Sequence, residues 1–167
     1  RLLALARAGR AAMLAAFGSL DEARAEAVVD TGPTDDPEPS LLLGVAEVLA
    51  SASSGDTAGA RALAAELDPP PRAVRSALWG AALVWALVPE VPSAWQALAD
   101  AQPALEPAVA AGRSGAAHLA GGPPAPPEAG AFLPAAWCAR TPVVVEVRLV
   151  GEPAVHRDRV PVVHASW

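Results

Sequence analysis

The sequence has no lysine, a single cysteine and few aromatic side chains. Aromatic residues make up 4% of the 167 residues and apolar residues 53%, so alanine, leucine and valine must do most of the packing. The lone Cys138 excludes an intramolecular disulfide and a cysteine metal cluster. These features fit a reducing compartment, and we expect a cytoplasmic protein.

Positive charge and long apolar runs are also scarce. At a net charge of −6, the chain gains no affinity for nucleic acid from phosphate neutralisation, which disfavours DNA or RNA binding by the chain as a whole. The apolar run from Ala77 to Pro89 is too short for the roughly twenty residues that a membrane span needs, so we expect a buried helix and no membrane association. Because the sequence begins with Arg1, we expect an excerpt of a longer chain.

The sequence offers little for catalysis or for binding a cofactor. It has no glycine-rich phosphate loop and no nucleophile elbow. Cys138 has no sign of an activating base beside it, and the spacing of His156 and His164 matches no zinc pattern. The acidic residues within 35–38 lack the alternation of a calcium loop. We therefore expect a protein that is not an enzyme and has no cofactor, metal or catalytic residue.

A short phrase recurs three times in the first hundred residues. The copies begin at Gly18, Gly55 and Pro89, 37 and 34 residues apart, and self-similarity at this period is typical of stacked helix-turn-helix units. Gly18 and Gly55 can close one helix in the left-handed conformation, and Asp56 can cap the next. A small residue five positions into each copy is expected to let two helices approach closely: Ala23, Ala60 and Ala94.

The expected fold is mainly α, a right-handed α-α helical-repeat array over residues 1–120 that is similar to tetratricopeptide repeats. Proline-rich breaks separate the expected helices, and the loop 31–39 is one of these breaks. The expected helices cover 2–17, 19–30, 41–52, 58–67, 72–88 and 93–101, with shorter ones at 104–111 and 114–119.

A change of pattern follows residue 120. Residues 121–141 are rich in proline and glycine, which predicts a semi-rigid extended linker or a surface strap. Alternating apolar and polar residues then predict a small antiparallel β-meander within 142–167. Its strands are expected at 143–149, 154–157 and 160–163.

The meander sequence resembles the start of a winged-helix DNA-binding domain. The run Val147-Arg148-Leu149, then Gly151, and the turn Arg157-Asp158 resemble the opening of this domain in streptomycete antibiotic regulatory proteins and relatives with a bacterial transcriptional activator domain. Arg159 stands where that family usually has glycine. The resemblance covers about 25 residues and implies an actinobacterial transcriptional regulator whose DNA-reading helix lies beyond Trp167, so that DNA would be bound only through the remainder of the parent protein.

The resulting functional hypothesis is a non-catalytic interaction or regulatory segment that binds a protein partner or another domain of its own chain. Arg72, Arg75 and Trp79 are the candidate partner-binding residues, although the arginines could equally be the solvated start of a helix and the tryptophan a core residue. The edge of the small sheet could pair two copies into a dimer. A small-ligand-sensing helical domain and a helical scaffold unrelated to transcription are the alternatives.

Overall fold

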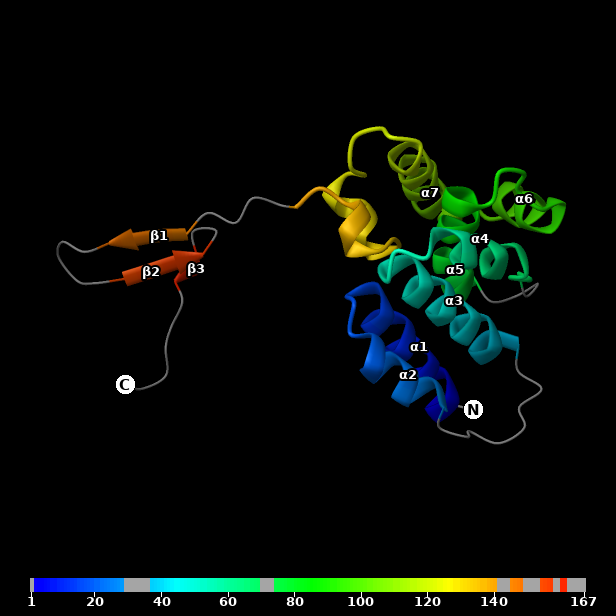
Figure 1. The fold of residues 1–167 in the computed structure, drawn as a ribbon, viewed down its shortest axis with the longest axis horizontal. Coiled ribbons are helices and arrows are strands. Elements are labelled where there is room, and N and C mark those ends of the chain that lie inside the picture. The colour runs from blue at the N-terminus through cyan, green and yellow to red at the C-terminus, as the bar shows by residue number, and fades with distance from the viewer. Residues whose placement is uncertain are drawn as a thin grey trace.

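The computed structural model describes residues 2–28, 37–69, 74–140, 145–148, 154–157 and 160–161. These residues are mainly α-helical, as the sequence predicted (Figure 1). Residues 2–140 hold every α-helix described, and the three short strands follow them.

The first four helices form two hairpins. The first joins α1 (Leu2–Ala16) to α2 (Leu20–Val28), and the second joins α3 (Pro37–Ser53) to α4 (Thr57–Ala65). Each hairpin turns at a glycine with positive φ, 82° at Gly18 and 87° at Gly55, which confirms the prediction of left-handed helix ends.

The start of α3 corrects the end of the predicted loop 31–39, because the helix already begins at Pro37. Residues 31–36 of that loop lie outside the described part of the chain. Pro37 and Pro39 both lie in its first turn, where the backbone N–H that proline lacks has no partner within the helix. Proline therefore marks the beginning of this helix, although its presence predicted a break.

The later helices are α5 (Val74–Leu87), α6 (Ser93–Ala101) and α7 (Glu106–Leu119), with the 3-10 turn η1 (Pro103–Leu105) between α6 and α7. The prediction of two short helices at 104–111 and 114–119 was wrong, because α7 is continuous. Gly112 sits inside it for a packing reason. A Cβ there would lie 2.5 Å from the Ala82 carbonyl oxygen and 2.6 Å from Trp85 Cβ, so only glycine lets α7 approach α5 this closely.

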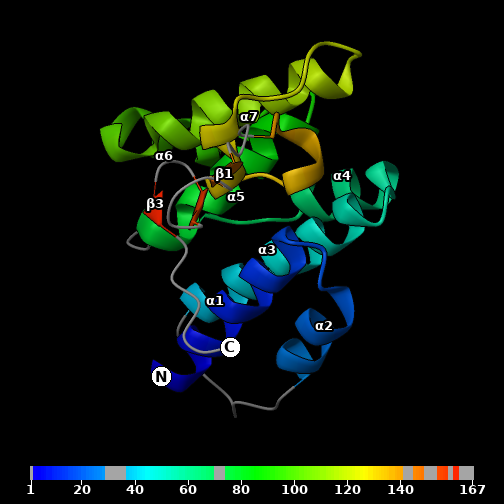
Figure 2. The same cartoon turned by 90° about the vertical axis from the view of Figure 1, so that its left-hand side faces the viewer.

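One layer of helices runs through the whole helical body. In this layer α1 packs on α3, α3 on α5 and α5 on α7 (Figures 1 and 2). Outside the layer, α2 packs on α1, and α4 packs on both α3 and α5. The face of α1 toward α3 is almost entirely alanine, and larger aliphatic side chains of α3 and α5 fill the centre. The largest fully buried aliphatic residues of these two helices are Val45, Val48, Leu49, Leu83, Val84 and Leu87.

The third copy of the recurring phrase does not pack as predicted. Ala23 and Ala60 are buried, but Ala94 is exposed and its neighbour Trp95 is fully buried. The indole of Trp95 lies against Gly80 of α5, and its Nε1 donates a hydrogen bond of 2.8 Å to the Leu67 carbonyl oxygen. A large ring therefore separates α5 from α6, where the first two copies place a small side chain.

Residues 121–140 form a strap that is packed onto the helices. Gly121, with a φ of 91°, closes α7, and the chain returns through two 3-10 turns, η2 (Pro127–Ala131) and η3 (Ala135–Trp137). The strap is tied to itself, because the Ala125 N–H donates to the Trp137 carbonyl at 2.8 Å and the Ala139 N–H to the Ala125 carbonyl at 2.7 Å. Ala125, Ala129, Leu133 and Trp137 belong to the same core as the helices. The sequence predicted either an extended linker or a surface strap here, and residues 125–139 form the strap.

Three short strands follow the strap. β1 (Val145–Arg148), β2 (Ala154–Arg157) and β3 (Val160–Pro161) pair antiparallel in the order β1-β2-β3. In the register, Glu146 lies opposite His156, and His156 opposite Pro161. The remaining residues of the predicted strands, 143–144, 149 and 162–163, lie outside the described part of the chain.

The cap on α4 gives a first testable prediction. Asp56 Oδ1 accepts a hydrogen bond of 2.8 Å from the Gly59 N–H, as the predicted N-cap should. Asp56→Ala should lower the free energy of unfolding by about 1 kcal/mol, because it leaves that donor without its partner. Asp56→Asn keeps the acceptor and should lower the free energy of unfolding much less. Urea titration of the two variants measures both losses. Equal losses for the two variants would show that the cap contributes nothing specific.

Candidate functional site

A groove crosses the first, third and fifth helices on one side of the layer. Its floor is a hollow of about 250 Å³ that opens to the surface. Each of the three helices contributes two of the residues that line it: Leu5 and Gly9 from α1, Glu38 and Leu42 from α3, and Ser76 and Trp79 from α5.

A second hollow, of about 440 Å³, continues the groove along α1. It shares Leu5, Gly9 and Trp79 with the first hollow, so the two form one continuous depression. Its other lining residues lie on α1 or, for Phe17, directly after it, and apart from Arg10 they are apolar: Ala6, Met13, Leu14 and Phe17. We call the combined depression the α1–α5 groove. A continuous apolar depression of this kind is typical of sites that bind peptides or other apolar ligands.

Two residues give the α1–α5 groove its shape. A Cβ placed on Gly9 would meet nothing within 4 Å, so the missing side chain leaves open space in the wall made by α1. On the opposite wall, Trp79 Nε1 donates a hydrogen bond of 2.8 Å to the Ala131 carbonyl of the strap. That bond fixes the indole while its ring remains partly exposed to the groove. The strap therefore helps to position the main aromatic side chain of the site.

The groove has a polar end at α3. Ser76 Oγ donates a hydrogen bond of 2.8 Å to Glu38 Oε1, and Ser76 is buried. Glu38 lies in the first turn of α3, where the helix dipole favours a negative charge. A ligand would therefore meet apolar side chains along most of the groove and a carboxylate at one end.

Of the predicted partner-binding residues, the structure places Trp79 in the groove. Arg72 lies outside the described residues. Arg75 belongs to α5, but its side chain is not among those described. Leu5 and Gly9 were not predicted from the sequence. The only signal for them was their place in an apolar helix, which does not distinguish a groove residue from a core residue.

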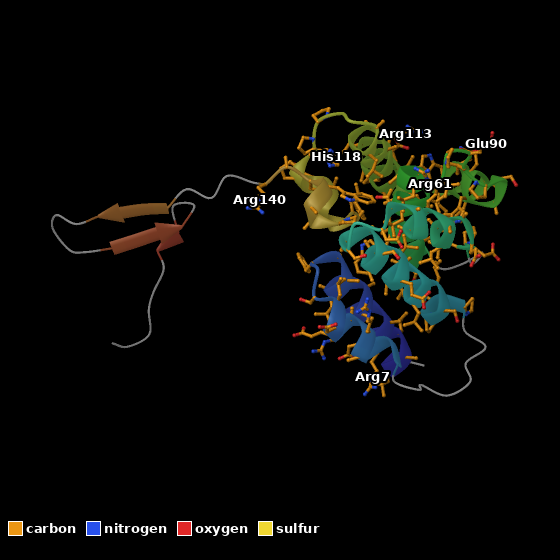
Figure 3. All side chains as sticks on the ribbon, viewed as in Figure 1. Arg7, Arg61, Glu90, Arg113, His118 and Arg140 are labelled. Carbon is orange, nitrogen blue, oxygen red and sulfur yellow. The ribbon has the colours of Figure 1, made fainter. Side chains whose placement is uncertain are left out.

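Other hollows in the described part of the chain are weaker candidates for a binding site. One lies between α3 and α4 and is bordered by three carboxylates, Glu47, Glu66 and Asp68. Another lies beside Arg61, whose Nε donates a hydrogen bond of 2.9 Å to the Leu87 carbonyl at the end of α5. Arg61 belongs to α4 and is labelled in Figure 3. It caps the C-terminus of α5, a position that favours a cation.

The titratable groups considered as catalytic or metal-binding candidates belong to different elements where the structure describes them. Cys138 is partly buried in the strap, its Sγ lies 3.7 Å from the Pro134 carbonyl oxygen, and burial raises the pKa of its thiol, which makes it a poorer nucleophile. His118 is on α7, 3.4 Å from the Gly122 carbonyl oxygen, His156 is on β2, and His164 is outside the described residues. Among the described residues, no group of three His, Cys, Asp or Glu side chains could hold a metal ion.

No described helix combines the length and the apolar character needed to cross a bilayer. No protein-family model matches this chain, and neither a curated protein nor a solved structure matches it.

Proposed function

We propose that this chain is a non-catalytic protein-interaction module of the cytoplasm whose α1–α5 groove binds an apolar peptide segment. The segment would belong to a partner protein or to another domain of the same parent chain. The observation that carries the proposal is the groove itself, which is open, spans three helices and is lined mainly by apolar side chains around the fixed indole of Trp79.

The proposed architecture is a tetratricopeptide-like, right-handed helical-repeat array. Its support is the succession of contacts α1–α3, α3–α5 and α5–α7. Helix α2 packs on α1, and α4 packs on α3 and α5. In such arrays the helices of one layer line an extended binding surface. The α1–α5 groove lies on this layer, and the buried Trp95 marks the place where the regular pairing of helices ends.

A small-ligand sensor is the competing function. Small-ligand sites are typically concave pockets that bury most of the ligand and present a few converging polar groups. The α1–α5 groove is open to solvent, and the polar side chains along it are few, with the Ser76–Glu38 hydrogen bond at one end. An extended apolar peptide, which can lie along an open depression, fits this shape better.

The setting in a transcriptional regulator is part of the proposal and rests on the resemblance of residues 145–167 to the start of a winged-helix domain. In that setting peptide binding would control the winged helix by domain docking, and DNA would be contacted only by the remainder of the parent protein. Reading the gene beyond the codon for Trp167 tests this part. An arginine-rich helix-turn-helix sequence is the expected result, and an unrelated sequence would remove transcription from the proposal.

Peptide binding is tested by selecting a phage-displayed library of random peptides on the immobilised 167-residue protein. Selected peptides should be apolar, and Gly9→Arg should weaken their binding by at least about tenfold, because the new side chain fills the groove. Ala62→Arg puts the same side chain on the exposed surface of α4 and should leave binding unchanged. Failure to enrich any peptide, or equal binding by both variants, would contradict the proposed function.

A further inference from the structure

The inner hollow of the α1–α5 groove is built from two levels of side chains. Ser53, the last residue of α3, donates a hydrogen bond of 3.0 Å to the carbonyl of Ala15 near the end of α1. Ser76 near the start of α5 donates one to Glu38 near the start of α3, so the three helices run in the same direction. Each helix contributes a first-level and a second-level residue about one turn apart: Leu5 and Gly9, Glu38 and Leu42, Ser76 and Trp79.

The second level is an apolar slot. Gly9 leaves open space on α1, since a Cβ there would meet nothing within 4 Å, and Leu42 is a buried part of the wall. Trp79 lines the same hollow, and its Nε1–H is already bound to the Ala131 carbonyl, so the indole offers a ligand only its apolar ring. A flat aromatic side chain fits this slot, because aromatic rings pack favourably in offset or edge-to-face arrangements.

The first level presents hydrogen-bond acceptors. Ser76 is buried, and its hydroxyl proton is donated to Glu38 Oε1 at 2.8 Å. An ionised carboxylate has no proton to donate, and its two oxygens together accept several hydrogen bonds at once. The hydroxyl oxygen of Ser76 can only accept a further bond, because its single proton is in use. A ligand group that reaches these two side chains must therefore bring a donor.

A neutral donor suits this level better than a cation. Glu38 lies in the first turn of α3, where the helix dipole already stabilises a negative charge. The other walls of the hollow are apolar, and burying an ammonium or guanidinium group against them costs free energy. The side chain of tyrosine combines an aromatic ring with a neutral hydroxyl donor at the tip of that ring.

We infer that the peptide in the α1–α5 groove is anchored by a tyrosine, whose ring packs on Trp79 beside Gly9 and whose hydroxyl donates to Glu38. The inference rests on the proposed function and names the side chain that the site selects. Tyrosine does not occur among the 167 residues, so neither these residues nor a second copy of them can supply the anchor. The anchor must come from a partner protein or from a part of the parent chain outside these residues.

Peptides selected on the unaltered 167-residue protein test this inference. The selected sequences should be apolar around one shared tyrosine. Replacing that tyrosine by phenylalanine should weaken binding by at least about tenfold, because the hydrogen bond to a carboxylate is lost while the ring is kept. Isothermal titration calorimetry of each peptide pair measures the ratio of the two dissociation constants.

Removal of the acceptors should remove the preference for tyrosine. The double variant Glu38→Ala, Ser76→Ala should bind the tyrosine and phenylalanine peptides about equally. Glu47→Ala takes a carboxylate from the exposed side of the same helix and should leave the preference unchanged. If the two side chains served folding alone, their replacement would weaken both peptides alike and would not alter the ratio.

The possible outcomes separate this inference from the proposed function. Equal binding of the tyrosine and phenylalanine peptides by the unaltered protein would overturn the inference and leave the function standing. Selected peptides anchored by phenylalanine, tryptophan or arginine would do the same, as would a tyrosine preference that survives in the double variant. A selection that enriches no peptide would contradict the proposed function and this inference with it.

Discussion

Trp95→Ala should lower the free energy of unfolding by about 3–5 kcal/mol. Trp95 is fully buried, and its ring fills the space between α6 and Gly80 of α5. Alanine would leave a cavity there and would also leave the Leu67 carbonyl oxygen without the indole donor that now lies 2.8 Å away. Chemical denaturation followed by circular dichroism measures the loss.

Two further variants separate the causes of that loss. Trp95→Phe keeps an aromatic ring but removes the donor, so it should cost less than alanine and still destabilise the protein measurably. Gln96→Ala changes the exposed neighbouring residue and should stay within about 0.5 kcal/mol of the unaltered protein. A loss for Trp95→Ala no larger than that for Gln96→Ala would mean that the ring does not hold α6 on the helical body.

Leu133→Ala should cost about 2–5 kcal/mol, although the residue lies in a stretch rich in proline and glycine. Leu133 is fully buried, and its Cδ1 lies 3.0 Å from where a Cβ on Gly115 would be, so the leucine occupies space that glycine leaves free on α7. The same substitution should also loosen Trp137, and the fluorescence of this indole should shift toward that of an exposed tryptophan. A free linker predicts neither effect.

Glu128→Ala is the control for the strap. Glu128 lies in η2 and is exposed, so its replacement should change stability by less than about 0.5 kcal/mol. If Leu133→Ala were as mild as Glu128→Ala, the strap would contribute little to the core, and its hydrogen bond to Trp79 would be a weak support for the groove.

Local signals in the sequence predicted most helix boundaries. Gly18 and Gly55 have the positive φ that their place after a helix indicated, and Asp56 caps α4. The predicted helix over 93–101 coincides with α6. Such features depend on a few neighbouring residues, so a single sequence contains the information needed.

The errors arose where contacts distant in sequence decide the structure. Gly112 reads as a helix break, yet it is the point where α7 approaches α5. Ala94 matched the repeat pattern, but the neighbouring Trp95 is the buried residue because it finds a partner in the Leu67 carbonyl. Nothing near Leu133 indicates that Gly115 leaves room for it.

The candidate site was less predictable than the fold. Trp79 was named from the sequence as a candidate partner-binding residue that could equally be a core residue, and it does line the groove. Leu5, Gly9 and Leu42 could not be chosen, because the groove exists only when α1, α3 and α5 are stacked. The packing of these three helices is a tertiary property that helical periodicity does not specify.

The position of the binding site is the central claim, and the indole N–H signals of the tryptophans test it most directly. A peptide selected on the protein would be titrated while these signals are recorded by NMR, with Trp79→Phe identifying the Trp79 signal. We predict that the Trp79 signal shifts as the peptide binds, because its ring lines the groove, while those of the buried Trp95 and Trp137 stay in place. Saturable binding that leaves the Trp79 signal unmoved would contradict the assignment of the α1–α5 groove as the binding site.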